Sequence, residues 1–155
     1  MKNLYRGLSL TGVLLMASGC ASTIGPELGL SAAGKLSPCP ASPNCVSSDA
    51  GGDRAIPPLA IASEADAAWQ ALLAYIEAEP RWTIAVREPL YLRAESRTLI
   101  LRFVDDVEFN LRPAEGQIAM RSASRLGYSD LGKNRRRLEA VREALAADGF
   151  VKSGT

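Results

Sequence analysis

Apolar and polar residues alternate through residues 82–126, and this period of two restricts the middle of the chain to β-strands. Four segments carry the pattern: 83–87, 90–96, 101–111 and 117–126. Short connections that contain proline or glycine join the first segment to the second and the third to the fourth. Because such short turns join antiparallel neighbours, the pattern predicts a four-stranded antiparallel sheet.

Helical periodicity lies on both sides of this predicted sheet. Apolar residues recur at spacings of three and four over residues 63–79, and Ser63 is the expected cap of that helix. A second helix is expected over residues 131–148, with Asp130 as its cap. Its apolar stripe would comprise Leu131, Leu138, Val141 and Leu145. Because the strands are grouped between the helices, we predict an α+β fold with both helices packed on one face of the sheet.

The first residues follow the pattern of an export signal. Lys2 and Arg6 precede an uncharged apolar stretch over residues 8–17, and small residues lead up to Cys20. This ending resembles a bacterial lipobox, which implies cleavage before Cys20 and acylation of that cysteine, with palmitate among the acyl groups. An uncleaved transmembrane anchor is the alternative, but glycine and hydroxyl residues leave it too little apolar length. Because Ala21 follows, the resemblance implies an outer-membrane lipoprotein that faces the periplasm.

Three regions therefore organise the chain: a signal peptide over residues 1–19, a lipidated cysteine with a flexible tether over 20–37, and a single α+β domain over 38–151. The tether is expected because its stretch is rich in glycine and carries little charge. Cys39 and Cys45 are the only other thiols, and an exported domain favours a disulfide between them. A redox-active pair is less favoured, since no basic side chain lies beside either thiol.

Composition removes several functions. The chain has no histidine, which excludes Ser-His-Asp and Cys-His nucleophiles and histidine metal ligands. Its formal net charge of +1 gives no global field for nucleic acid, so we expect no nucleic-acid partner. Two thiols without histidine make a poor zinc site, and nothing in the sequence indicates a cofactor or a resident metal.

Asp105 is the most unusual position in the predicted sheet. It is the one charged residue on an otherwise apolar face of the strand over 101–111. An uncompensated carboxylate there is costly, so Asp105 should be hydrogen-bonded, ion-paired or turned outward by a bulge.

Closing the turn over residues 113–116 predicts a strand register. It pairs Arg112 with Gln117, Phe109 with Met120, Val107 with Ser122, Asp105 with Ser124, and Glu108 with Arg121. Asp105 would face a hydroxyl on the inner side of the sheet. Glu108 and Arg121 would form an opposite-charge pair on the outer, exposed side, where such pairs contribute little.

A basic run opens the predicted final helix, where the helix dipole disfavours cations. The run comprises Lys133, Arg135, Arg136 and Arg137. A compensating partner is therefore expected, and the candidates are Asp105, Asp106 and Glu108 or an external anion held jointly with Arg121 and Arg125. A solvated basic face is the alternative.

Three segments together resemble domain-of-unknown-function family 1499: residues 39–48 (CPASPNCVSS), 103–109 (FVDDVEF) and 121–137 (RSASRLGYSDLGKNRRR). The resemblance spans about residues 38–147 and implies a small envelope or plastid protein, often membrane-anchored, with no established activity. The polar residues in these blocks are Asp105, Asp106, Glu108, Arg121, Ser122, Ser124, Arg125, Tyr128, Asp130, Asn134, Arg135 and Arg137.

The sequence favours a lipid-anchored periplasmic module that binds or scaffolds, held at the membrane by its lipid. Its partner would be an anionic small molecule or an envelope protein. The expected ligand-binding residues are Asp105, Asp106, Arg121, Ser124, Arg125, Tyr128, Asn134, Arg135 and Arg137. A hydrolase that uses Asp105 and Asp106 as acid and base, or with Glu108 as ligands of a divalent cation, is the first alternative. A purely structural charge network is the second, and no catalytic residue is assigned.

Overall fold

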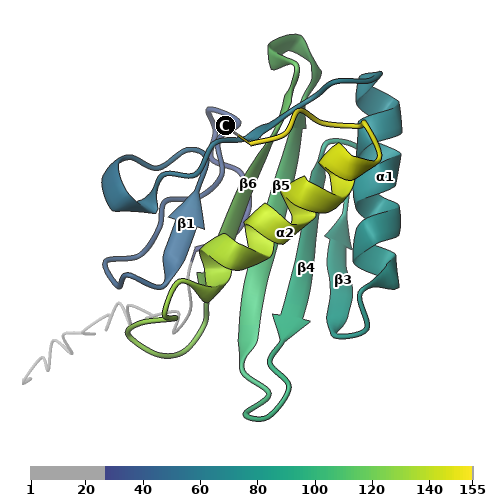
Figure 1. Cartoon of the computed structure of the whole chain (residues 1–155). Coiled ribbons are helices and arrows are strands. Elements are labelled where there is room, and N and C mark those ends of the chain that lie inside the picture. Colours follow the sequence, from purple (N-terminus) through teal and green to yellow (C-terminus); the bar gives the residue numbers. More distant parts are fainter. Residues whose placement is uncertain (1–26, 155) are drawn as a thin grey trace, which may run out of the picture.

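The computed structural model describes residues 27–154 and has one antiparallel sheet with two helices across one of its faces (Figure 1). The elements are β1 (Cys45–Ser47), β2 (Leu59–Ala60), α1 (Ala65–Ala78), β3 (Trp82–Arg87), β4 (Tyr91–Arg97), β5 (Val104–Arg112), β6 (Gln117–Ser124) and α2 (Lys133–Ala147), with short 3-10 turns η1 (Gly52–Arg54) and η2 (Pro113–Glu115). Within residues 27–154 no helix is long and apolar enough to cross a membrane. The predicted signal peptide and Cys20 lie outside the described residues.

The sheet contains six strands rather than the four that we predicted. Its main order is β1-β6-β5-β4-β3, and β2 pairs with β6 beyond the end of β1. The two additional strands, β1 and β2, are only three and two residues long. Strands this short give no readable alternation, which is why the sequence pattern missed them. The α+β class is confirmed and the strand number is corrected.

The predicted register of the central hairpin is confirmed. Asp105 lies opposite Ser124, and Glu108 lies opposite Arg121. The η2 turn closes the hairpin and ends at Gly116, whose φ of +62° favours glycine. A one-residue shift would exchange the two faces of both strands, so this turn determines which carboxylates face the helices.

The hydrophobic core lies between the sheet and the two helices. Its buried members include Trp69, Leu72, Leu73 and Ile76 from α1, Leu138, Val141 and Leu145 from α2, and Leu92, Val107, Phe109, Ile118 and Met120 from the sheet. The predicted helical stripes therefore form the core, with one exception. Leu131 precedes α2 and is 83% exposed, so its assignment to the stripe was wrong.

The helix ends differ slightly from the predicted ones. Helix α1 is capped at Glu64, and the Ser63 hydroxyl instead donates to the carbonyl oxygen of Phe150 at 3.3 Å. Helix α2 begins at Lys133, but the Asp130 carboxylate still accepts the amide of Asn134, at 2.6 Å. A left-handed Gly149 ends α2.

The face of the sheet opposite the helices is partly covered by the segment over residues 29–38. Its hydrogen bonds join the Gly29 amide to Glu108 and the Leu36 amide to Asp49. Leu36 is buried against the sheet, so the expectation that this stretch is a flexible tether was wrong for these residues. The predicted disulfide between Cys39 and Cys45 is present and fastens the end of the segment to β1.

Candidate functional site

The predicted polar cluster is divided between the two faces of the sheet. Consecutive residues of β5 point to opposite faces, so Asp105 faces α2 and Asp106 faces away from it. Both carboxylates are buried. The interpretation of Asp105, Asp106 and the arginines as one site is therefore not supported, and each face has its own ion pairs.

On the helix face, Asp105 pairs with Arg137 of α2. The Arg137 guanidinium also donates to the Ser122 hydroxyl, at 2.9 Å, and to the side-chain oxygen of Asn134, at 2.5 Å. Asn134 in turn donates to the Ser124 hydroxyl at 3.0 Å. Arg137, near the start of α2, thus has a buried acidic partner within the protein. For this cation, the interpretation that an acidic residue of the sheet compensates the basic run is confirmed.

On the opposite face, Asp106 and Glu95 surround the guanidinium of Arg125. The Arg125 Nε donates to Asp106 at 2.7 Å, and its Nη2 donates to Asp106 at 2.8 Å and to Glu95 at 2.6 Å. Arg93 approaches Asp106 at 3.0 Å from the neighbouring strand. The hydrogen bonds that Arg125 donates to the Asp106 carboxylate outweigh desolvation and raise the pKa of Arg125 above its ordinary value.

Glu108 and Arg121 form a pair that is fully buried, not exposed as we predicted. The segment over residues 29–38 covers them, and Glu108 accepts hydrogen bonds from the Gly29 amide and the Tyr91 hydroxyl, both at 2.7 Å. Burial and the neighbouring Glu108 charge raise the pKa of Tyr91 above its ordinary value. Tyr91 therefore stays a hydrogen-bond donor to Glu108 over the physiological pH range.

The remaining predicted site residues lie apart from these pairs. Arg135 donates to the carbonyl oxygens of Asp53 and Ala55, at 2.9 and 2.8 Å, and so holds the η1 turn. Tyr128 is 78% exposed and lies on the loop before α2. The predicted arginines at 121, 125, 135 and 137 thus all donate to groups of the protein itself.

The described residues also give no arrangement for metal chemistry. Among residues 27–154 no three His, Cys, Asp or Glu side chains lie close enough to hold a metal ion. Asp105 and Asp106 cannot join Glu108 around one cation, since Asp105 lies on the other face of the sheet. Among the described residues, the carboxylates that the hydrolase alternative requires therefore do not share one site.

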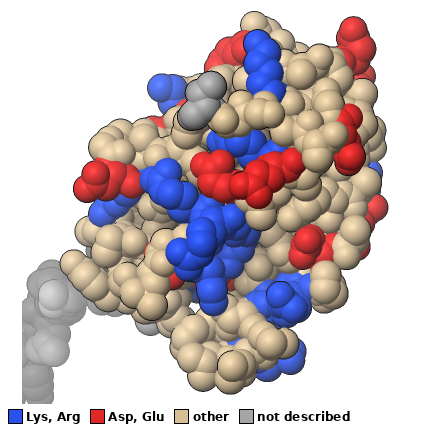
Figure 2. Space-filling view, in the orientation of Figure 1, with Lys and Arg blue, Asp and Glu red and all other residues tan. Residues whose placement is uncertain are grey.

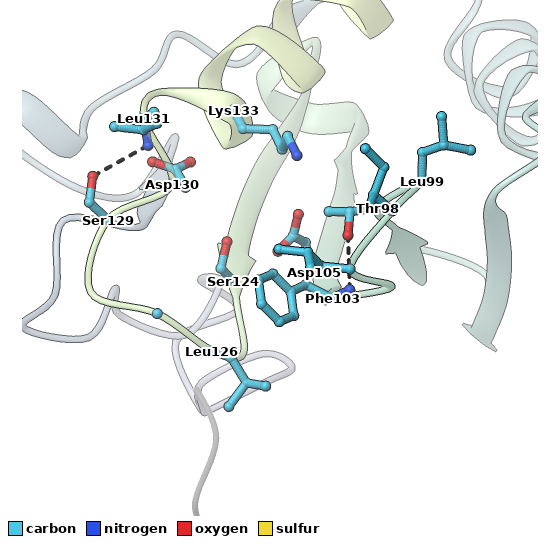
Figure 3. Close-up of a pocket in the computed structure, with 13 residues that line it drawn as sticks. Thr98, Leu99, Phe103, Asp105, Ser124, Leu126, Ser129, Asp130, Leu131 and Lys133 are labelled. Carbon is cyan, nitrogen blue, oxygen red and sulfur yellow. Dashed lines mark hydrogen bonds between the residues drawn. The ribbon is translucent and has the colours of Figure 1, made fainter.

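A groove that the sequence interpretation missed lies at the end of the sheet where β5 begins (Figure 3). It has a volume of about 570 Å³ and lies between loop 98–103, which joins β4 to β5, and loop 125–132, which joins β6 to α2. Its apolar lining consists of Leu99, Ile100, Leu101, Phe103, Leu126 and Leu131. Thr98, Asp105, Ser124, Ser129, Asp130 and Lys133 add polar groups.

Local hydrogen bonds shape both loops of this groove. Thr98 closes the first loop, because its backbone and its hydroxyl both bond to the backbone of Phe103, at 2.9 Å each. In the second loop the Asp130 carboxylate accepts the amide of Gly132 at 3.0 Å. Leu131 has a φ of +53°, a left-handed conformation that costs about 1–2 kcal/mol for a residue with a Cβ and here accompanies an exposed side chain.

Lys133 supplies the positive charge of the groove. Figure 3 shows its side chain extending over the space between the two loops, with Ser124 and Asp105 below it. Asp105 is already paired with Arg137, whereas Lys133 makes no ion pair with any residue in the described part of the chain. The groove therefore combines an apolar wall with an ammonium group available to a ligand.

The fold and the groove define a small, disulfide-fastened α+β domain with its ligand-accessible apolar surface at one end of the sheet. The chain belongs to the DUF1499 family, described as proteins of unknown function, whose family model matches residues 35–145. No curated protein and no solved structure matches the chain. The family membership confirms the resemblance seen in the sequence and adds no activity.

Proposed function

We propose that this protein is a lipid-anchored periplasmic module of the outer membrane that binds an anionic amphiphile in the groove between loops 98–103 and 125–132. The observation that carries the proposal is the groove itself, which has a volume of about 570 Å³, an accessible apolar wall and Lys133 at its edge. The lipobox-like ending at Cys20 supports the anchor. The alanine after that cysteine supports the outer membrane.

The paired charges are unsuitable as the ligand site. If Arg137 paired with an external anion, Asp105 would remain buried without its partner. The same holds for Glu108 if Arg121 left it for a ligand. Breaking a buried pair in this way costs about 3–5 kcal/mol, more than one ordinary ligand contact returns. The arginines therefore act through the fold, and ligand binding falls to the groove.

The lining of the groove indicates the chemistry of the ligand. Its volume of about 570 Å³ lies within the range of small-molecule sites. Removing its leucine and phenylalanine surface from water favours an apolar chain by roughly 25 cal/mol per Å². The unpaired ammonium of Lys133 favours an anionic head group. A single-chain amphiphile, such as a fatty acid, satisfies both requirements.

Calorimetric titration of the purified protein with dodecanoate and with dodecanol tests this site. Phe103→Ala should weaken binding of both compounds, because it removes part of the apolar wall. Lys133→Gln should weaken dodecanoate several-fold and leave dodecanol unchanged. Leu90→Ala, in the turn between β3 and β4, is a matched control for an exposed apolar residue that does not line the groove. The proposal is refuted if dodecanoate binding is not saturable, or if neither groove substitution changes the affinity for dodecanoate.

The anchor has a separate test. Intact-mass measurement of the protein from membranes should give a chain that begins at Cys20 and carries acyl groups, and Cys20→Ala should abolish both features. Membrane protein that retains residues 1–19 and carries no acyl mass would exclude the lipoprotein assignment without bearing on the groove.

A further inference from the structure

The most exposed apolar side chains of the described residues are gathered at one end of the molecule. Six large apolar side chains are more than 60% exposed, and all six lie on loops 98–103 and 125–132. We call four of them the apolar tip: Leu99 at 75%, Ile100 at 86%, Tyr128 at 78% and Leu131 at 83% exposure. Apart from these six, the exposed large apolar residues within residues 27–154, such as Phe103 and Leu90, are at most 48% exposed.

Cationic side chains surround this tip. Arg81 and Lys133 line a small hollow together with Leu99, Arg102 lies within the first loop, and Arg136 bonds the carbonyl oxygen of Leu131 at 2.9 Å. All four cations are exposed, and none forms an ion pair within residues 27–154. Figure 2 shows the result as an uncharged lobe at the lower edge of the molecule, with basic side chains beside and above it.

The course of the N-terminal segment points to the same end. Residues 29–34 run along β5 in its own direction, because Gly29 bonds to Glu108 and Gly34 bonds to Arg112. Followed from Gly34 back to Gly29, this segment therefore approaches the beginning of β5, the strand that loop 98–103 precedes. Six residues lie between Cys20 and Glu27, and the seven steps from one to the other span at most about 25 Å.

We propose that the apolar tip enters the interfacial layer of the membrane that holds the lipid anchor, and that the surrounding cations contact anionic phospholipid head groups. Exposed apolar side chains with a basic collar are typical of surfaces that lie in a bilayer interface. Each such cation strengthens binding to an anionic membrane about fivefold. The inference rests on the proposed anchor for the orientation and goes beyond the proposed function by placing the mouth of the groove against the bilayer.

Tryptophan quenching by brominated lipids tests this orientation on the full acylated protein. Ile100→Trp and Tyr128→Trp each place a reporter on the tip, and Leu90→Trp is the control at an exposed turn elsewhere in the sheet. In vesicles of phosphatidylcholine and phosphatidylglycerol, we expect both tip reporters to shift to the blue and to lose at least twice as much emission as the control. The wild-type signal from Trp69 and Trp82 gives the background.

The outcomes separate this inference from the proposed function. If the protein carries acyl mass and floats with vesicles, yet the tip reporters are quenched no more than Leu90→Trp, the tip lies in water and the inference is overturned. If the protein carries no acyl mass, the anchor fails, and flotation that Arg102→Gln with Lys133→Gln abolishes still supports the tip. A non-acylated protein that does not float overturns the inference too. Dodecanoate binding is measured without vesicles and so reports only on the groove.

Discussion

Charged side chains are buried in the middle of the sheet, and large apolar side chains are exposed at its end, which is the reverse of the usual distribution. In the middle, Asp106, Glu108 and Arg121 are buried, and each has a partner of opposite charge. Asp105, at the edge of the groove, is buried and paired in the same way. At the end, Ile100 and Leu131 are more than 80% exposed. The buried polar residues of this chain thus maintain the fold, whereas its leucines and isoleucine at the end of the sheet form the accessible apolar surface. Substitutions in the two regions should therefore separate stability from binding.

The largest expected effect is that of Glu108→Gln. The substitution keeps a side chain that accepts hydrogen bonds from Tyr91 and Gly29, but it leaves the charge of Arg121 buried without compensation. We expect the free energy of unfolding, measured by urea denaturation, to fall by about 3–5 kcal/mol. Glu143→Gln removes an exposed carboxylate that has no ion pair within residues 27–154, and it should change little. Equal stabilities for the two variants would mean that the buried pair contributes nothing.

The second effect concerns the pair between Asp105 and Arg137. Arg137→Met should lower the free energy of unfolding by about 2–3 kcal/mol, because Asp105 then stays buried without a cation. Adding Asp105→Asn should recover part of this loss, since the neutral amide no longer requires a charged partner. A double-mutant cycle should give a coupling energy of at least about 1 kcal/mol. Additive losses would show that the two groups do not depend on each other.

The sheet was predictable from the sequence where its signals are local. Alternation over residues 101–111 and 117–126 located β5 and β6, and closing one turn fixed their register. The burial of Glu108 and Arg121 was not predictable, because the covering segment over residues 29–38 has neither helical nor strand periodicity. The alternation within one strand determines which face of the sheet a residue points to. Whether that face is exposed to solvent depends on a segment distant in the sequence.

The candidate site was predictable only in part. Partners for the basic run at the start of α2 were expected, and Asp105 is one. The groove was missed because Leu101 was assigned to a strand, whereas the structure places it in loop 98–103. The one available signal was the run Leu99-Ile100-Leu101, in which the alternation stops although no charge intervenes. Such a run reads as a buried strand as readily as an exposed loop.

The third effect is that of the disulfide between Cys39 and Cys45. Its expected contribution to the free energy of unfolding is smaller than that of the buried ion pairs and larger than that of the exposed apolar residues. It closes a ring with a sequence separation of six and fastens the covering segment to β1. In the chain-entropy model a ring of this size contributes about 2 kcal/mol. Reduction with dithiothreitol should lower the free energy of unfolding by that amount, and Cys39→Ala with Cys45→Ala should reproduce the loss and remove the response to dithiothreitol. No change on reduction would show that the hydrogen bonds of the segment hold it without the disulfide.

A smaller effect depends on pH and comes from Asp49, which accepts hydrogen bonds from Arg112 and from the Leu36 amide. Burial alone would raise the pKa of Asp49, but these hydrogen bonds outweigh it and hold the pKa below the ordinary 3.8. The folded state thus binds the proton less readily than the unfolded state, so this contribution is present above the ordinary pKa and is lost as the pH falls through the lower one.

Asp49→Asn is the corresponding test. It should lower the free energy of unfolding by about 1 kcal/mol at neutral pH, and the gap to the wild type should close as the pH falls below about 3.8. Urea denaturation at several pH values measures the gap, and Asp148→Asn, at an exposed residue after α2, is the control. A gap that stays constant or widens in acid would contradict the assigned direction of the pKa.

The smallest effect on stability should come from Ile100→Ser combined with Leu131→Ser, a variant that separates binding from stability. Both side chains are more than 80% exposed, so their removal takes little apolar surface out of the core, and the free energy of unfolding should change by less than about 0.5 kcal/mol. The same two side chains line the groove, so dodecanoate binding should weaken at least several-fold. Glu108→Gln should behave in the opposite way, with dodecanoate affinity close to that of the wild type wherever the variant is folded. A stable double variant that binds as well as the wild type would show that the exposed apolar end has no part in binding, and the contrast between the two regions would then be one of packing alone.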